Sequence, residues 1–406
     1  MKEAYQQAYE SGFYAKPTGL QGKYDNTRRY WEDAIIAMNL RPYITRMLNE
    51  KEKLNILDIG CGGGDGYELL KSAIKRDPPL EQHEVSLLPS HLFRYDGVDI
   101  NPTLIDQAKD THTETDRISF NVCDITQGLA PKHEETKYDI FLSTYGTLSH
   151  FDNSQLEDII NYIAEISPKH SFLFCDFLGA YSYEWQNNWK IDPLREFFLD
   201  YRISYLYSEE EREQVDVDSF PLRLVTPEEI TVLVNRVKEK STKKIDIVHM
   251  YDRSMLIGRH IDTGEYNPGP QFIRKKANRL HEDYIRTNTE SLYFNYYPKK
   301  NFPKQNRHYR NLERCWNAVI GYFNARIRER INPVNYDEWH DYPPVVQQAL
   351  MTIDRVVDSV AWMEYGDPRA NIIEPQLGYA LRNLEIKLSA GRGYGHSFVV
   401  VIEIKE

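Results

Sequence analysis

The chain has 406 residues, 41% of them hydrophobic, and a formal net charge of −11, so it can bury a large core but offers little attraction to phosphates. These figures make nucleic acid an unexpected partner, and the lack of any run of about eighteen apolar residues argues against a membrane span. The first residues show no apolar secretion signal and the four cysteines are widely spaced, which together predict a cytoplasmic protein.

A polar, glycine-containing turn at residues 14–32 leads into a helical pattern at residues 30–50. The stretch Leu54–Gly66, LNILDIGCGGGDG, then reads as an apolar strand that enters a glycine-dense turn before a helix. Glycines lack a Cβ, so the backbone of such a turn can approach a ligand closely. We interpret it as a loop for a nucleoside-containing cofactor, built on Gly60, Gly62, Gly63 and Gly64.

Two common nucleotide loops do not fit this stretch. The sequence has no Gly-Lys-Ser/Thr after the glycines, which excludes a P-loop. A dinucleotide site places an acid about twenty positions after the loop, whereas Asp99 comes 39 residues after Gly60. A polar, proline-containing loop at residues 77–90 accounts for the excess.

Further strand patterns alternate with helical ones along the chain, which predicts a doubly wound, mostly parallel sheet of α/β class. The expected strands cover residues 54–59, 95–100, 117–122, 138–144, 171–176 and 244–251, and the last covers Gly395–Ile404. About 140 residues separate the last two strands. Within that gap, residues 307–331, 344–365 and 371–388 have amphipathic helical patterns.

Four stretches in this order resemble the class I S-adenosylmethionine-dependent methyltransferases: Leu54–Gly66, Tyr95–Ile100, Ile118–Ile125 and Tyr138–Ser149. The resemblance implies a Rossmann-like, seven-stranded sheet with an antiparallel last strand. It also implies S-adenosylmethionine as the cofactor and methyl transfer as the activity. The order of the four matches is far more specific than any single glycine loop.

The resemblance also implies roles for individual residues. Asp99, at a strand end, would accept hydrogen bonds from both ribose hydroxyls, and Asp124 with its neighbour would lie beside the adenine. The leading segment would close over the cofactor, with Tyr24, Arg28, Arg29 and Trp31 as candidate lid residues. The expected cofactor-binding residues are Tyr24, Arg29, Asp58, Gly60, Gly62, Gly64, Asp99, Ile100, Asp124, Ile125 and Ser143.

Simpler roles remain open for several of these residues. Asp99 precedes Asn101-Pro102 and could serve a turn, and Asp58 could bond only to loop amides. Either candidate arginine of the lid could be a surface charge that never meets the methionine carboxylate.

The expected catalytic residues, His150 and Tyr145, follow the fourth strand, where the acceptor would approach the methyl group. His150 is the candidate base, although a histidine there could instead cap a helix or bond a carbonyl. The stretch lacks the Asn/Asp-Pro-Pro-Tyr/Phe and Pro-Cys sequences of the related nucleic-acid enzymes. We therefore expect methylation of an oxygen or nitrogen on a small-molecule acceptor.

The expected organisation is a methyltransferase domain with its lid at residues 1–260, a helical insertion at residues 261–388, and the last strand at residues 389–406. The insertion would cap the substrate or form a homodimer, or it could be a stabilising appendage. The polar run at residues 252–265 is interpreted as a hinge, because no compact metal-ligand motif is present and no metal is expected. Two alternatives stay open: an aminopropyltransferase-like enzyme, suggested by GGGDG, and a catalytically silent S-adenosylmethionine-binding interaction protein.

Overall fold

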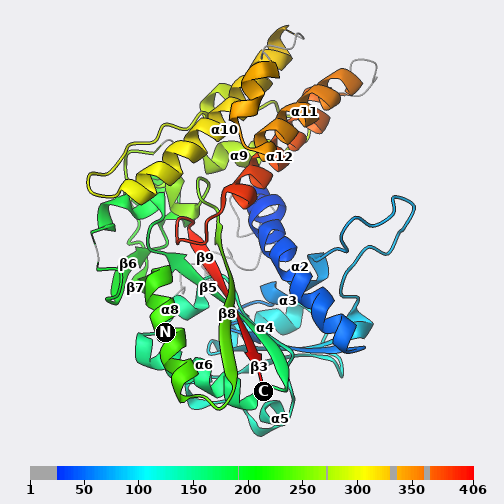
Figure 1. The fold of residues 1–406 in the computed structure, drawn as a ribbon, viewed down its shortest axis with the longest axis vertical. Coiled ribbons are helices and arrows are strands. Elements are labelled where there is room, and N and C mark those ends of the chain that lie inside the picture. Colours follow the sequence, from blue (N-terminus) through cyan, green and yellow to red (C-terminus); the bar gives the residue numbers. More distant parts are fainter. Residues whose placement is uncertain (1–24, 191, 271–272, 330–335, 361–365) are drawn as a thin grey trace.

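The computed structural model describes residues 25–190, 192–270, 273–329, 336–360 and 366–406. A twisted sheet forms its centre (Figure 1). Its strands are β1 (Leu54–Ile59), β2 (Phe93–Asp99), β3 (Ile118–Val122), β4 (Ile140–Ser143), β5 (His170–Gly179), β6 (Phe197–Arg202), β7 (Ser219–Val225), β8 (Lys244–Arg253) and β9 (Ser397–Lys405).

The strand order confirms the expected mostly parallel, doubly wound sheet. Strands β3, β2, β1, β4 and β5 lie side by side and parallel, and β9 runs antiparallel between β5 and β8. All seven strands expected from the sequence are therefore present, with the last one antiparallel. This order places the ends of β1 and β4 next to each other in the middle of the sheet.

Strands β6 and β7 form a hairpin that the sequence patterns did not predict. Strand β9 pairs with β5 from His170 to Leu178, so one edge of β5 is occupied along nearly its whole length. On its other edge β5 pairs with β4 only as far as Cys175, and β7 pairs with Leu178 and Gly179 beyond that point. The hairpin therefore stands above the carboxyl end of β4.

The two faces of the sheet carry separate layers of helices. In β1, Leu54 and Ile56 pack with α2 (Asp33–Glu50), α3 (Asp65–Ser72) and α4 (Pro102–Thr111). Leu57 and Ile59 point the other way and pack with α6 (Asn153–Ile166) and α8 (Pro227–Lys240). This is the two-residue alternation of a strand buried on both faces. Two further short helices are α5 (Pro131–Glu134) and α7 (Glu209–Arg212).

Among the described residues, four α-helices lie between β8 and β9: α9 (Arg274–Arg279), α10 (Pro303–Glu329), α11 (Pro344–Ser359) and α12 (Glu374–Leu388). Helices α10, α11 and α12 pack against one another and extend beyond one end of the sheet (Figure 1). Their apolar core is continuous with the core beneath α2, where Trp31 and Trp316 have ring centroids 5.9 Å apart. Within the described ranges, no helix has both the length and the apolar character needed to cross a membrane.

Candidate functional site

A cavity opens where the parallel strands end, because the carboxyl ends of parallel strands share one edge of the sheet. At one end of the cavity the lining comes from the segments that follow β1, β2 and β3. These residues include Gly60, Gly62, Asp99, Ile100, Asp124 and Ile125, all of which were expected to bind the cofactor.

The glycine loop shapes the floor of the cavity. Gly60 and Gly62 have φ angles of +72° and +54°, which residues other than glycine rarely adopt. A Cβ on Gly60 would overlap Thr147, whereas a Cβ on Gly62 would meet nothing within 4 Å. The space above Gly62 is therefore open to a ligand. Gly64 lies outside the lining, and a Cβ there would overlap His112.

Asp99 stands at the end of β2 with its carboxylate fixed by the backbone. Its Oδ2 accepts the Gly62 N–H at 2.9 Å, and its Oδ1 accepts the Asn101 N–H at 2.8 Å. These two backbone bonds orient the carboxylate at the wall of the cavity. The bond from Asn101 is the turn contact that the simpler interpretation of Asp99 expects, and it does not prevent ligand binding.

Asp58 and Ser143 lie beneath the loop and do not line the cavity. The Tyr95 hydroxyl donates to Asp58 Oδ2 at 2.6 Å, while Asp58 Oδ1 is buried without a partner among the described residues. Burial raises the pKa of Asp58 to about 7. The Ser143 hydroxyl donates to the Ile59 carbonyl at 3.1 Å. Both residues therefore support the loop from below.

The lid candidates separate into different environments. Tyr24 lies outside the described residues, and Arg29 is exposed, with its guanidinium 5.1 Å from the centre of the Tyr30 ring. Arg28 is buried and lines the cavity, with its guanidinium carbon 3.7 Å from the centre of the Tyr145 ring. Neighbouring residues of a helical segment point in different directions, so only one of the two arginines faces the cavity.

Both expected catalytic residues line the cavity. Tyr145 has a φ of +62°, which is uncommon for tyrosine, and its backbone N–H donates to Asp176 at 2.8 Å. Its hydroxyl donates to Asp33 at 3.1 Å. Burial lowers the pKa of His150 to about 4, so this imidazole is neutral at pH 7 but is a weak base.

The opposite end of the cavity lies beneath the unexpected hairpin. Tyr201 of β6 and Leu222 of β7 line it together with Leu178 at the end of β5. Tyr205 and His396 complete this end, which we call the distal end. The tyrosine cluster at residues 201–207 is compatible with an aromatic acceptor pocket or with ordinary packing, and two of its members line the cavity. Leu178, Leu222 and His396 were not expected at the site, because their strands or loops carry no recognisable motif.

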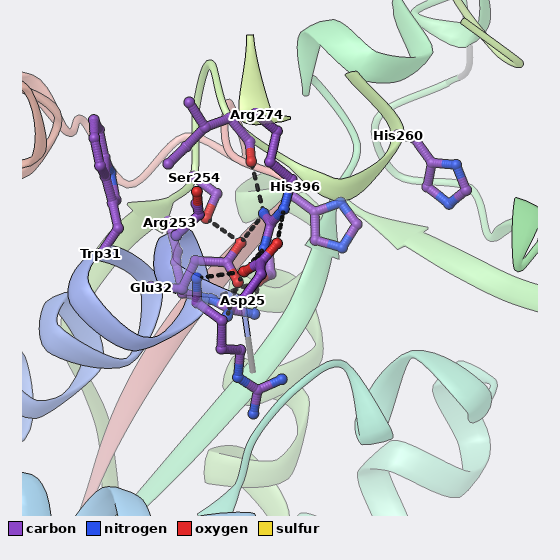
Figure 2. A network of polar contacts seen from close by, with 12 residues as sticks. Asp25, Trp31, Glu32, Arg253, Ser254, His260, Arg274 and His396 are labelled. Atoms are coloured by element: carbon purple, nitrogen blue, oxygen red, sulfur yellow. Dashed lines mark hydrogen bonds and ion pairs between the residues drawn. The ribbon is translucent and has the colours of Figure 1, made fainter. Parts of the chain in front are cut away.

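A buried ionic network stands beside the cavity (Figure 2). The Arg274 guanidinium donates to Asp25 through Nε and Nη2, each at 2.9 Å, and to Glu32 through Nη1 at 3.0 Å. Arg253 lines the cavity and pairs with Asp176 at 3.1 Å. Burial raises the pKa of Glu32, but the nearby arginines outweigh that effect and hold its pKa well below the ordinary value.

The polar run at residues 252–265 holds backbone segments together. Asp252 accepts the N–H groups of Ala390, Arg392 and Tyr394, and Asp262 accepts those that begin helix α9. In the part of the chain that the structure describes, no group of three or more His, Cys, Asp or Glu side chains could hold a metal ion.

No family model and no curated protein matches this chain. Several solved structures are similar to it at low identity. A methyltransferase from Methanosarcina mazei is 17% identical over 49% of this chain and 83% of its own, with a TM-score of 0.33. The magnesium protoporphyrin IX methyltransferase from Synechocystis is 11% identical over 62% and 91%, with a TM-score of 0.36. The plantazolicin methyltransferase BamL is 14% identical over 92% and 84%, also with a TM-score of 0.36.

Proposed function

We propose that this chain, whose sheet has the strand order of the class I methyltransferases, is an S-adenosylmethionine-dependent methyltransferase. It would transfer the methyl group to an oxygen or nitrogen of a small-molecule acceptor. The observation that carries the proposal is the single cavity that joins the ends of β1, β2, β3 and β4 and presents the glycine loop, Asp99 and Asp124 in that order.

The residues at this end of the cavity fit the proposed cofactor. Asp99 lies in the lining at the end of β2, where a carboxylate suits the ribose hydroxyls, and the open space above Gly62 admits the amino-acid part. Ile100 and Ile125 offer apolar surface beside an adenine. The lining also holds four carboxylates against three guanidiniums, which suits a cationic sulfonium: Glu32, Asp65, Asp99 and Asp124 against Arg28, Arg253 and Arg259.

When bound, the cofactor supplies an activated methyl group. The task of the chain is to orient the acceptor and exclude water, because positioning is the main protein contribution to such a transfer. Tyr145 and Arg28 stack where the fourth strand ends, which supports a role in covering the reacting atoms. The distal end, enclosed by the β6–β7 hairpin, supports an acceptor of small size.

Calorimetry of S-adenosylmethionine binding tests the proposal. Asp99→Ala removes the ribose acceptor and should weaken binding about tenfold or more, since hydrogen bonds to a charged group contribute roughly 1.5–3 kcal/mol. Asp110→Ala, at an exposed position at the end of helix α4, is the matched control and should bind as wild type. Equal affinity in the Asp99 variant, or preferential binding of a nicotinamide dinucleotide, would contradict the assignment.

Turnover separates the two alternatives from methyl transfer. Wild-type protein with methyl-labelled S-adenosylmethionine and a metabolite extract should yield a labelled small molecule. A silent binding protein would give no label transfer. An aminopropyltransferase would instead consume decarboxylated S-adenosylmethionine when a diamine such as putrescine is supplied.

A further inference from the structure

His396 stands immediately before β9 and lines the distal end of the cavity. Its Nδ1 lies 2.7 Å from Oε2 of Glu184. Its Nε2 makes no hydrogen bond to any described residue. This nitrogen is also not one of the fully buried polar atoms that lack a hydrogen-bond partner. Figure 2 shows the His396 ring beside the ionic network, in the direction of His260. One nitrogen of the ring is thus held, and the other is available.

Glu184 is buried and is itself fixed by several donors. Its Oε1 accepts the backbone N–H of His260, and its Oε2 accepts the Ser182 hydroxyl at 3.3 Å. Gly258 packs so closely that a Cβ there would overlap the carboxylate. A carboxylate can only accept, so the shared proton belongs to Nδ1 of His396. Nε2 then keeps its lone pair free to take a proton.

The distal end offers apolar surface around this nitrogen. Leu178, Tyr201, Tyr205 and Leu222 line the cavity together with His396. These apolar and aromatic side chains suit a flat apolar ring, and the imidazole can then contact a polar group on that ring. His150 also lines the cavity, but burial lowers its pKa to about 4, which makes it a weak base.

The strength of an imidazole base limits which hydroxyl it can deprotonate. An ordinary imidazole has a pKa of about 6.5 and a phenol about 10, so the two lie within a few powers of ten. An aliphatic alcohol with a pKa like that of water, about 15.7, is a weaker acid than the imidazolium ion by roughly nine powers of ten. An amine or a carboxylate presents a lone pair without needing a base at all.

We propose that His396, oriented by Glu184, is the general base for methylation of a phenolic hydroxyl; this inference rests on the proposed function. The hydroxyl proton passes to Nε2 of His396 while the phenol oxygen bonds to the methyl carbon. The carbon–sulfur bond breaks and its electron pair stays on sulfur, which gives an aryl methyl ether and S-adenosylhomocysteine. His396 then returns the proton to solvent. His396 is the catalytic residue, and Glu184 is a positioning residue.

Methyl-labelled S-adenosylmethionine with three acceptors tests this proposal at about pH 8.5. The acceptors are 2-naphthol, the equally shaped 2-naphthylamine, and 4-nitrophenol, which is already ionised at that pH. Wild type should methylate 2-naphthol in preference to 2-naphthylamine. His396→Gln, which can still donate to Glu184, should lower kcat for 2-naphthol about 100-fold or more. Because the nitrophenolate needs no base, the kcat of His396→Gln for methylation of 4-nitrophenol should fall by less than about fivefold.

Two further variants separate catalysis from structure. Glu184→Gln should lower kcat for 2-naphthol about tenfold and spare 4-nitrophenol, because it removes only the charge that supports the imidazole. His91→Gln, at an exposed position before the amino end of β2, whose opposite end meets the cavity, should match wild type throughout. All variants should bind S-adenosylmethionine with wild-type affinity.

If the protein binds S-adenosylmethionine, two results for His396→Gln would overturn the inference: wild-type turnover of 2-naphthol, or an equal loss of kcat for 2-naphthol and 4-nitrophenol. Two results for the wild-type protein would also overturn it: preference for 2-naphthylamine, or no aryl ether from either phenol. Failure of the wild-type protein to bind S-adenosylmethionine is a separate outcome, since it would remove the proposed function as well.

Discussion

Gly60 and Gly62 have similar backbone angles but face different surroundings, and that difference separates a structural glycine from one that gives room to a ligand. A Cβ on Gly60 would overlap Thr147 inside the protein, whereas a Cβ on Gly62 would enter the open cavity. Gly62→Ala should therefore weaken S-adenosylhomocysteine binding about tenfold in calorimetry, while urea unfolding shows a loss of only about 1–2 kcal/mol from backbone strain.

Gly60→Ala is the matched variant for that comparison. It should lower the unfolding free energy by more than Gly62→Ala does, because Thr147 has to move in addition to the strain. Equal cofactor affinity in wild type and Gly62→Ala would show that the ligand does not approach this part of the loop.

Asp58 gives the apoprotein a pH dependence of stability with a definite sign. Burial raises its pKa to about 7 against an ordinary 3.8, with Asp65 and Asp99 adding to the rise and the Tyr95 hydrogen bond opposing it. The stability that comes from its neutral form is fully present below about pH 3.8 and is lost as the pH rises through about 7. Asp58→Asn keeps an acceptor for Tyr95 and cannot ionise.

At about pH 8, the unfolding free energy of Asp58→Asn from urea titration should therefore exceed that of wild type by about 2–4 kcal/mol. The difference should vanish near about pH 4. Tyr95→Phe, which removes the hydrogen bond but keeps the carboxyl group, should retain the pH dependence. A pH-independent difference between Asp58→Asn and wild type would contradict the raised pKa.

At the level of single residues, the sequence indicated the cofactor end of the cavity better than the distal end. Asp99 and the glycines stand in a contiguous pattern whose spacing reflects a strand followed by a turn, and that pattern predicts their location. His396 has no such pattern. It reaches Glu184 across 212 residues of chain, and only the fold brings those two side chains together.

Helix α9 and the segment before α2 are joined by the Arg274 network. Arg274→Met would leave the buried carboxylates of Asp25 and Glu32 without their main partner. Breaking a buried ion pair on one side costs about 3–5 kcal/mol, so urea unfolding should show a loss of that size. The control is Arg279→Met at an exposed position of the same helix, which should change stability by less than about 0.5 kcal/mol. Wild-type stability in Arg274→Met would show that the carboxylates find other partners.

The β6–β7 hairpin is the element that sequence patterns missed. Strand β7 contains Pro221, which argues against a strand, and β6 begins with two consecutive phenylalanines that break the alternation of a half-buried strand. Pro221 is accommodated because β7 pairs with β5 only at Leu224 and Val225, so at Pro221 one edge of β7 faces no described strand. The long helices were predicted well, because their apolar positions repeat over many turns.

Considered as a whole molecule, the fold depends on β9, which contributes to both apolar layers. Val399 and Val401 pack on the α2 side and Val400 and Ile402 pack on the α6 side. Val400→Asp would place a charge in a fully buried position between β5 and β8 and should abolish cooperative unfolding in calorimetry or circular dichroism. Val248→Asp, at a position of β8 that is 42% exposed, should fold normally. A folded Val400→Asp protein would show that β9 is dispensable for the sheet.

The doubly wound sheet followed from the alternation of strand and helix patterns, because crossover connections place helices on both faces of a parallel sheet. The antiparallel last strand was implied only by the family resemblance. The domain boundaries did not follow in the same way. Trp31 precedes the sheet and Trp316 lies between β8 and β9, yet both belong to one core. A boundary drawn along the sequence at residue 260 therefore stays a prediction.

The position of β9 has a consequence for synthesis of the protein on the ribosome. Strand β8 pairs only with β9 among the described strands, and β9 leaves the ribosome more than a hundred residues after β8. During that interval β5 lacks its partner on the edge that β9 will occupy, and β8 has no partner strand among the described residues. Sheet edges of this kind attract other unfolded chains, so we expect the half-made protein to be prone to association until translation of β9 closes the gap.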